Sequence, residues 1–255
     1  MALSDDEKWI LAENLKRQER EDIAKVERGQ DASDGDFGSY YALLTGKNSE
    51  WVKAHAVSDE GYLSSYAAQL RSLLPDLADK GATILDAGCG PGLLTRALAE
   101  GFGARETLGI DISESAVAYG RKTFPRCRFE VVSIDGATDL GRRFDLVHAR
   151  EFYPFTRTSD PDFHRQYLAA LARHVEAGGA LVLTLLSSPK SLAANAAALG
   201  PDLEKVGMTP FRRTALASSR LASAMPLPAA RAATALLARL RGRSPVRFYV
   251  SRRAR

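Results

Sequence analysis

The hydrophobic pattern of the chain becomes regular from about residue 82 onward. Short apolar runs there alternate with windows in which apolar residues recur at helical spacing. The predicted strands are 83–86, 107–111, 128–133, 144–149 and 180–186, and the predicted helices are 93–102, 115–124 and 162–175. Because short apolar strands alternate with helices, the pattern predicts an α/β fold: a doubly wound, mostly parallel sheet covered by helices on both faces.

The segments that flank this core have weaker patterns. Residues 5–28 predict a charged surface helix, residues 31–61 a glycine-punctuated aromatic stretch typical of a lid, and residues 62–74 a helix that Pro75 stops. Beyond the core, the sequence predicts a helix, an alanine-rich helical segment with spaced arginines and a last strand, at 191–206, 215–240 and 246–251. We therefore expect an N-terminal helical extension (1–61) and one domain (62–255) with a variable helical cap (188–245) before its last strand.

Composition excludes several classes of protein. With 255 residues, 45% of them hydrophobic and 26% charged, the chain fits a folded globular domain and neither a disordered nor a fibrous protein. Two cysteines, Cys89 and Cys127, are too few for a disulfide framework or an iron–sulfur cluster, and no metal site is expected. The sequence shows neither a secretory signal nor an apolar run of spanning length, so we expect a cytoplasmic protein.

Charge is distributed unevenly between the two parts of the chain. Residues 205–255 contain Lys205, eleven arginines and no acidic residue, whereas residues 1–204 hold 23 basic and 31 acidic residues. This asymmetry indicates that the C-terminal part meets an anionic group, which leaves open a phosphorylated substrate, a membrane surface, a nucleic acid and the protein's own acidic face. The arginines show no nucleic-acid-reading motif, so charge alone would give only sequence-independent affinity.

A glycine-rich loop carries the strongest chemical signal. The sequence Ile84-Leu85-Asp86-Ala87-Gly88-Cys89-Gly90-Pro91-Gly92-Leu93 predicts an apolar strand, a tight turn and the start of a helix. Glycines permit positive φ and close approach of a ligand, and the N-terminus of a helix offers N–H groups to an acceptor. The spacing is G-x-G-x-G, and Leu93 stands where a dinucleotide fingerprint would have its third glycine.

This loop resembles the first motif of the class I S-adenosylmethionine-dependent methyltransferases, in which an acidic residue precedes x-G-x-G-x-G. Asp86, Gly88, Gly90 and Gly92 match that motif. Asp111, which closes the next strand, resembles the family's ribose-binding acidic residue, and Asp135 in Asp135-Gly136-Ala137 resembles the aspartate that accepts from the adenine amino group. The resemblance implies a cofactor site made of Asp86, Gly88, Gly90, Gly92, Asp111, Ile112, Asp135, Gly136 and His148.

Two further motifs follow in the family's order. Residues 144–150 resemble the fourth-strand motif, beside which substrate and methyl group meet, and residues 177–183 resemble the turn and fifth strand. The resemblance covers about half the chain, over residues 82–187. It implies S-adenosylmethionine as cofactor, S-adenosylhomocysteine as product, a Rossmann-like methyltransferase fold and an antiparallel last strand.

Residues 148–157, after the fourth strand, offer candidates for catalysis and acceptor binding. His148, Glu151 and Tyr153 are candidate bases, and histidine is the residue type among them that ordinarily serves as a base near neutral pH. Arg150 and Arg157, with Tyr40 and Tyr41 of the expected lid, are candidate substrate-binding residues. The alternative is structural: Arg150 and Glu151 would form an ion pair, and the aromatic residues would pack beneath neighbouring helices. His164 and His174 lie in a helical window and are expected at the surface.

The functional expectation is methyl transfer from S-adenosylmethionine to a small molecule or metabolite, at oxygen or nitrogen. An acidic, phosphorylated, natural-product or sugar-precursor acceptor would suit the arginines. The alternatives are a non-catalytic cofactor-binding partner protein, a nucleic-acid methyltransferase and a nicotinamide-dependent reductase. The basic C-terminal helix has two interpretations, a cap helix packed on the domain or a peripheral membrane contact. Oligomeric state is not indicated by the sequence.

Overall fold

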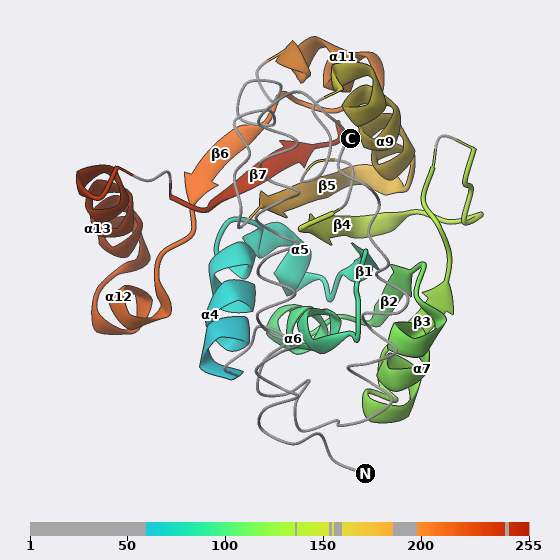
Figure 1. Cartoon of the computed structure of the whole chain (residues 1–255), viewed down its shortest axis with the longest axis horizontal. Coiled ribbons are helices and arrows are strands. Elements are labelled where there is room, and N and C mark those ends of the chain that lie inside the picture. Colours follow the sequence, from blue (N-terminus) through green and yellow to red (C-terminus); the bar gives the residue numbers. More distant parts are fainter. Residues whose placement is uncertain are drawn as a thin grey trace, which may run out of the picture.

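A computed structural model describes residues 60–135, 137–152, 155, 160–185, 198–242 and 245–254. Its centre is a seven-stranded sheet with the strand order β3-β2-β1-β4-β5-β7-β6 (Figure 1). The strands are β1 (Thr83–Ala87), β2 (Glu106–Asp111), β3 (Arg128–Val131), β4 (Phe144–Arg150), β5 (Val175–Leu185), β6 (Arg212–Ala215) and β7 (Arg247–Arg252). The first five strands are parallel to one another, whereas β7 is antiparallel to both of its neighbours. The predicted doubly wound sheet and antiparallel last strand are confirmed.

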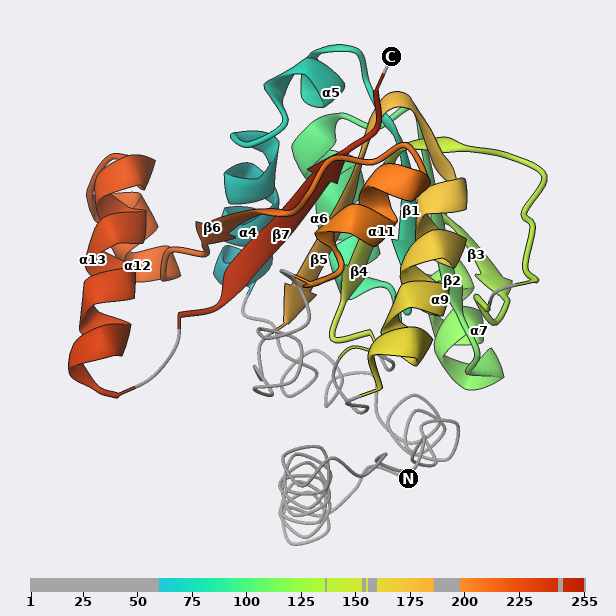
Figure 2. The ribbon, with the colours of Figure 1, turned by 90° about the horizontal axis from the view of Figure 1, so that it is seen from above.

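Helices cover both faces of the sheet, as the apolar strands require (Figure 2). The helices are α4 (Glu60–Arg71), α5 (Pro75–Asp79), α6 (Leu93–Phe102), α7 (Glu114–Thr123), α9 (Pro161–Arg173), α11 (Gly200–Lys205), α12 (Ser219–Ala224) and α13 (Leu227–Leu240). Successive strand residues point to opposite faces, so Ile84 packs in the cluster that contains α4 and α6, and Leu85 packs in the cluster that contains α9. Two apolar cores therefore sandwich the parallel strands.

Residues at the ends of α5, α6 and α7 explain where these helices begin or end, and Pro75 has a different role from the one predicted. Pro75 does not simply stop the preceding helix but lies in the first turn of α5, where its missing N–H costs nothing. α6 ends at Gly103, whose φ of 56° is the left-handed conformation that glycine adopts readily at a helix end. Ser113 is the N-cap of α7, and its side chain accepts a hydrogen bond from the Ala116 N–H.

The C-terminal part also differs from expectation. The expected helical cap contains β6, a short strand that pairs with β7 at the edge of the sheet, and its alanine-rich segment is divided into α12 and α13. Of the helix expected at 191–206, the structure describes residues 198–206, with α11 at its end; residues 186–197 lie outside the described part, as do residues 1–59 of the expected extension.

α12 and α13 stand to one side of the sheet, next to β6 (Figures 1 and 2). Arg231 of α13 ties this pair to α4, because its guanidinium donates to the Gln69 carbonyl and to Ser72 Oγ. Three leucines of α13 are exposed, Leu236, Leu237 and Leu240. This packing favours the cap-helix interpretation, and the membrane contact stays a prediction. Within the described ranges, no helix is both long and apolar enough to cross a membrane.

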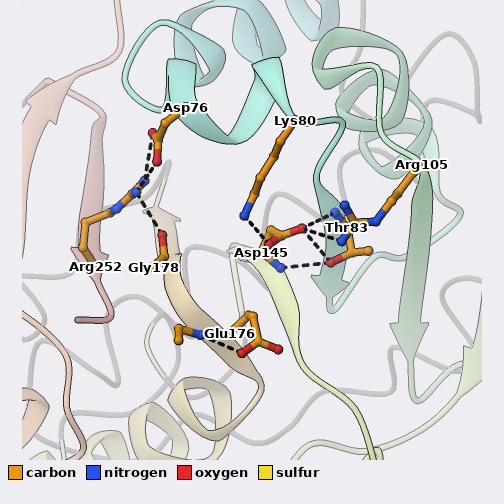
Figure 3. A network of polar contacts seen from close by, with 9 residues as sticks. Asp76, Lys80, Thr83, Arg105, Asp145, Glu176, Gly178 and Arg252 are labelled. Atoms are coloured by element: carbon orange, nitrogen blue, oxygen red, sulfur yellow. Dashed lines mark hydrogen bonds and ion pairs between the residues drawn. The ribbon is translucent and has the colours of Figure 1, made fainter. Parts of the chain in front are cut away.

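A polar network ties strands together at the amino edge of the sheet (Figure 3). The buried Asp145 side chain accepts from Lys80 Nζ at 2.6 Å, from the Thr83 N–H at 2.8 Å and from Arg105 Nη2 at 3.2 Å. Burial acts to raise the pKa of Asp145, but the hydrogen bonds from Lys80 and Thr83 outweigh it and hold the pKa below its ordinary value. The network thus joins the start of β4 to the start of β1.

Two histidines expected at the surface are buried instead. His174 follows α9, and its ring bridges the Leu140 N–H and the Ala170 carbonyl oxygen. Burial lowers its pKa, which favours the neutral ring. His164 is also fully buried, and its ring lies 5.4 Å from that of Phe155 between centroids. Helical spacing alone did not reveal which side of α9 faces the sheet.

Candidate cofactor and acceptor site

The glycine loop lies at the carboxyl edge of the sheet, between the end of β1 and the start of α6. Gly88, Gly90 and Gly92 all have positive φ, at 70°, 52° and 85°. The N–H groups of Gly88 and Cys89 both donate to the Ile110 carbonyl oxygen, which fastens the loop to β2. The N-cap residue of α6 is Gly92, which makes no side-chain cap hydrogen bond. The loop is therefore a backbone cradle beside the start of a helix, a place suited to a polar ligand.

Close packing explains why the loop needs glycine at two positions. A Cβ on Gly92 would lie 2.4 Å from Phe129 Cε1, and one on Gly88 would lie 3.0 Å from Phe152 Cδ2. Cys89, between them, is buried, and desolvation raises the pKa of its thiol. A neutral buried thiol behaves as a small apolar side chain, so Cys89 fills space in the loop.

Asp111 closes β2 beside this cradle. Its Oδ2 accepts from the Gly90 N–H at 2.8 Å, and its Oδ1 accepts from the Ser113 N–H at 2.9 Å. The residue is 8% exposed, and burial is the largest of several effects that together raise its pKa. Ile112, the next residue, is 60% exposed although it is apolar. One carboxylate thus shapes the glycine loop, and an uncovered apolar side chain stands next to it.

Asp86 and His148 form the centre of a second, fully buried network. Asp86 Oδ2 accepts from Thr95 Oγ1 at 2.6 Å, and its Oδ1 lies 2.8 Å from His148 Nδ1. Because a carboxylate only accepts, the proton of that second bond belongs to Nδ1. On the other side of the ring, His148 Nε2 lies 2.7 Å from the Tyr66 hydroxyl, which is also bonded to Thr184 Oγ1 at 2.7 Å.

This network encloses His148, one of the residues expected to act as a base. Both nitrogens of His148 are occupied by protein partners and the ring has no exposed surface, so it holds Asp86 in place in this conformation and offers no nitrogen to an acceptor. Sequence analysis missed Tyr66, Thr95 and Thr184. Tyr66 and His148 are 82 positions apart, and only Thr95, near the glycine loop, had a signal that could have drawn attention to it.

Replacing Tyr66 with phenylalanine tests this network. The variant leaves His148 Nε2 and Thr184 Oγ1 buried without their partner, so we expect the free energy of unfolding to fall by about 1–3 kcal/mol. Urea unfolding would measure the change. The matched control is Tyr119→Phe, on α7 and outside this network, which should alter stability by less than about 0.5 kcal/mol. Equal stabilities of the two variants would contradict the assigned network.

Asp135 follows β3 in an exposed turn. Its Oδ1 accepts from the N–H groups of Ala137 and Thr138 and from Thr138 Oγ1, and these bonds, that from Ala137 first, lower the pKa of the carboxyl group. The side chain thus shapes the turn, and its contact with adenine stays a prediction. Gly136, Tyr153, Arg157, Tyr40 and Tyr41 lie outside the described residues.

The end of β4 turns sharply beside the loop. Arg150 is the last residue of β4, and Glu151 follows it with a positive φ of 50°, unusual for a residue with a side chain. The Glu151 N–H donates to the Thr184 carbonyl oxygen, which continues the pairing with β5. Phe152 then reaches the glycine loop at Gly88. Three consecutive residues therefore connect β4 to the cofactor cradle. Arg150 and Glu151 form no ion pair with each other in the described structure, but Phe152 and Phe155 pack against Tyr167 and His164 of α9, so the structural alternative holds for these aromatic residues only.

Comparison with known proteins agrees with this geometry. Residues 84–179 match the family described as "Methyltransferase domain". This segment therefore carries a Rossmann-like methyltransferase domain of class I. It is similar to trans-aconitate 2-methyltransferases of Variovorax paradoxus (30% identity, 53% of this chain and 52% of that protein) and Deinococcus radiodurans (33%, 47% and 43%). The chain thus spans about half the length of these curated relatives.

A solved structure supports the fold of this methyltransferase domain over more of the chain. Magnesium protoporphyrin IX methyltransferase from Synechocystis, solved with bound S-adenosylmethionine, superposes with a TM-score of 0.53. The match covers 86% of this chain and 95% of that one at 14% identity. At that identity the likeness concerns the fold, including the described segments that flank residues 84–179.

Proposed function

We propose that this protein transfers the methyl group of S-adenosylmethionine to a small-molecule acceptor and releases S-adenosylhomocysteine. The observation that carries the proposal is the tie between Asp111 and the glycine loop, in which the ribose-binding candidate accepts from the Gly90 N–H at 2.8 Å. One carboxylate therefore sets both the shape of the loop and the position of the expected ribose contact.

The described residues fit this cofactor. The loop of Gly88, Gly90 and Gly92 leaves room for close approach, and Asp111 has two oxygens for two vicinal hydroxyls. The exposed Ile112 supplies an apolar surface for the adenine ring. The glycine loop and Asp111 would hold the cofactor, whose sulfonium would supply an electrophilic methyl carbon for in-line attack by the acceptor's oxygen or nitrogen; the new bond would form as the C–S bond breaks with its electron pair left on sulfur. The protein's own task is to align the acceptor and exclude water.

Calorimetric titration with S-adenosylhomocysteine tests the cofactor. We expect micromolar binding of S-adenosylhomocysteine and none of NADH, which serves as the control for a dinucleotide site. Binding of NADH alone would support the reductase alternative. If neither S-adenosylhomocysteine nor NADH binds, the proposed function is wrong.

The acceptor needs a separate assay, with release of S-adenosylhomocysteine as the readout. Because the relatives from Variovorax and Deinococcus are trans-aconitate 2-methyltransferases, trans-aconitate is the first acceptor to assay. We expect turnover with a small organic acceptor and none with nucleic acid. Cofactor binding without turnover on any acceptor would instead favour the non-catalytic partner protein.

A further inference from the structure

Two buried polar groups without hydrogen-bond partners lie next to each other at the carboxyl edge of the sheet. Five buried side-chain polar atoms of the described residues have no partner, and two of them are Arg150 Nε and the Tyr62 hydroxyl. The Arg150 guanidinium lies over the Tyr62 ring, with its central carbon 5.3 Å from the ring centroid. Orphaned donors cost free energy, and two at one place indicate a missing acceptor.

Arg150 differs from Arg231 and Arg253, the other two described arginines whose Nε atom is buried without a partner. Arg231 and Arg253 each donate through Nη2 to backbone carbonyl oxygens. Arg150 has neither a hydrogen bond nor an ion pair with any described residue; its recorded contacts are with the rings of Tyr62 and Tyr66, at 5.3 and 5.7 Å. A guanidinium that stacks on aromatic faces keeps its N–H edge available for a coplanar acceptor.

The fold explains why this cation is held at the edge of the sheet. Leu146, His148 and Arg150 alternate along β4 and point to the face covered by α4. Leu146 and His148 are fully buried, whereas Arg150 is only partly buried and emerges beside Tyr62, one turn before Tyr66 on α4. Two residues further on, Phe152 touches the glycine loop. Arg150 and Tyr62 therefore border the cofactor cradle.

We propose that Arg150 and Tyr62 bind a carboxylate group of the acceptor, so that the substrate is a small organic acid. The proposal rests on the proposed function. Arg150 Nε and one Nη form a fork that fits the two oxygens of a carboxylate, and the Tyr62 hydroxyl donates a further bond. Burial raises the pKa of Tyr62, more than the positive charge of Arg150 lowers it, so the hydroxyl stays protonated and remains a donor. One guanidinium balances a single negative charge, which favours a carboxylate over a doubly charged phosphate.

The test measures acid binding separately from cofactor binding. Protein saturated with S-adenosylhomocysteine is titrated calorimetrically with trans-aconitate, succinate and benzoate, with trimethyl trans-aconitate and phenyl phosphate for comparison. We expect at least one free acid to bind and the triester to bind at least tenfold more weakly. Arg150→Gln should weaken acid binding by about 100-fold, and Tyr62→Phe by about tenfold. Both variants should keep wild-type affinity for S-adenosylhomocysteine.

Matched controls separate this role from a structural one. Arg239→Gln removes an exposed arginine of α13 and should leave acid binding unchanged. Tyr62→Phe removes an orphaned hydroxyl, so it should not lower the unfolding midpoint, and Arg150→Lys should recover only part of the affinity because it lacks the fork.

Failure of this inference is distinguishable from failure of the proposed function. If S-adenosylhomocysteine binds the wild type but no acid does, or if acids bind wild type and Arg150→Gln equally well, the carboxylate site is wrong while the proposed function stands. Binding of phenyl phosphate in preference to every acid would also overturn it. If S-adenosylhomocysteine itself does not bind, the proposed function fails first.

Discussion

Replacing Asp111 with alanine is expected to weaken binding of S-adenosylhomocysteine by about 100-fold. A hydrogen bond to a charged group contributes about 1.5–3 kcal/mol, and each 1.4 kcal/mol is a factor of ten in affinity. The variant loses the expected ribose contact and also the acceptor that holds the Gly90 and Ser113 N–H groups. Calorimetric titration of folded variant and wild type measures the difference.

Two further variants make the Asp111 result specific. Asp111→Asn keeps the side-chain volume, but its amide nitrogen cannot accept, so an intermediate affinity is expected. Glu114→Ala removes an exposed carboxylate three positions further on, in the first turn of α7, and should bind as the wild type does. If Asp111→Ala also binds as the wild type does, the ribose assignment is wrong.

The second large effect concerns stability at the opposite edge of the sheet. Asp145→Asn is expected to lower the free energy of unfolding by about 2–3 kcal/mol at pH 7, because the amide replaces a buried carboxylate that accepts from Lys80, Thr83 and Arg105. Lys80 and Arg105 are partly exposed and regain water, which keeps the loss below that of a fully buried pair. Urea unfolding measures the change.

The same substitution has a defined pH dependence. The folded-state pKa of Asp145 is below its ordinary value of about 3.9, so the folded protein binds this proton less readily than the unfolded chain does. The stabilisation is therefore fully present above the unfolded pKa and is lost as pH falls through the folded pKa. The difference between wild type and Asp145→Asn should shrink below about pH 4.

An exposed ion pair provides the control for Asp145. Asp76 pairs with Arg252 nearby, and Asp76→Asn should cost less than about 1 kcal/mol because water screens that pair. Neither substitution lies near the glycine loop, so both folded variants should bind S-adenosylhomocysteine normally. A difference between wild type and Asp145→Asn that does not change with pH would mean that the carboxylate charge is not what stabilises this edge.

The contrast between Asp111 and Asp145 follows from the direction of the parallel strands. Both are buried aspartates, but Asp111 ends β2 and Asp145 lies near the start of β4. In open α/β sheets, ligands bind outside the carboxyl ends of the strands. The carboxylate at that end remains beside the ligand cradle, whereas the one at the amino end is surrounded by structural partners. We therefore expect substitution of Asp111 to change the binding of S-adenosylhomocysteine and substitution of Asp145 to change the stability of the fold.

The order of the core elements could be predicted because it depends on local patterns. An apolar strand, a glycine turn and an amphipathic helix are each encoded by neighbouring residues, and glycine is required wherever φ is positive. Asp111 was found through its resemblance to the family's ribose-binding acidic residue, and it lies next to the loop because parallel strands bring their carboxyl ends to the same edge. The sequence thus predicted the fold class and the candidate cofactor loop.

Features that depend on distant residues were missed. His164 of α9 and His174 just after it were placed at the surface because spacing does not show which face meets the sheet. β6 was not predicted because a four-residue edge strand has too short a pattern. His148 looked like an available base until Tyr66, from another element, was found on its second nitrogen.

The sequence by itself determined the strand–loop–helix order, the glycine turn and the carboxylate at the end of β2, because these arise from interactions between residues close along the chain. Only the tertiary structure decided that His148 is enclosed by Asp86 and Tyr66, and that Arg150 is left beside Tyr62 with its N–H edge unpaired by any described residue. Those outcomes depend on how α4 packs across β4. That packing is set by the burial of apolar surface over the whole domain, which no local pattern specifies.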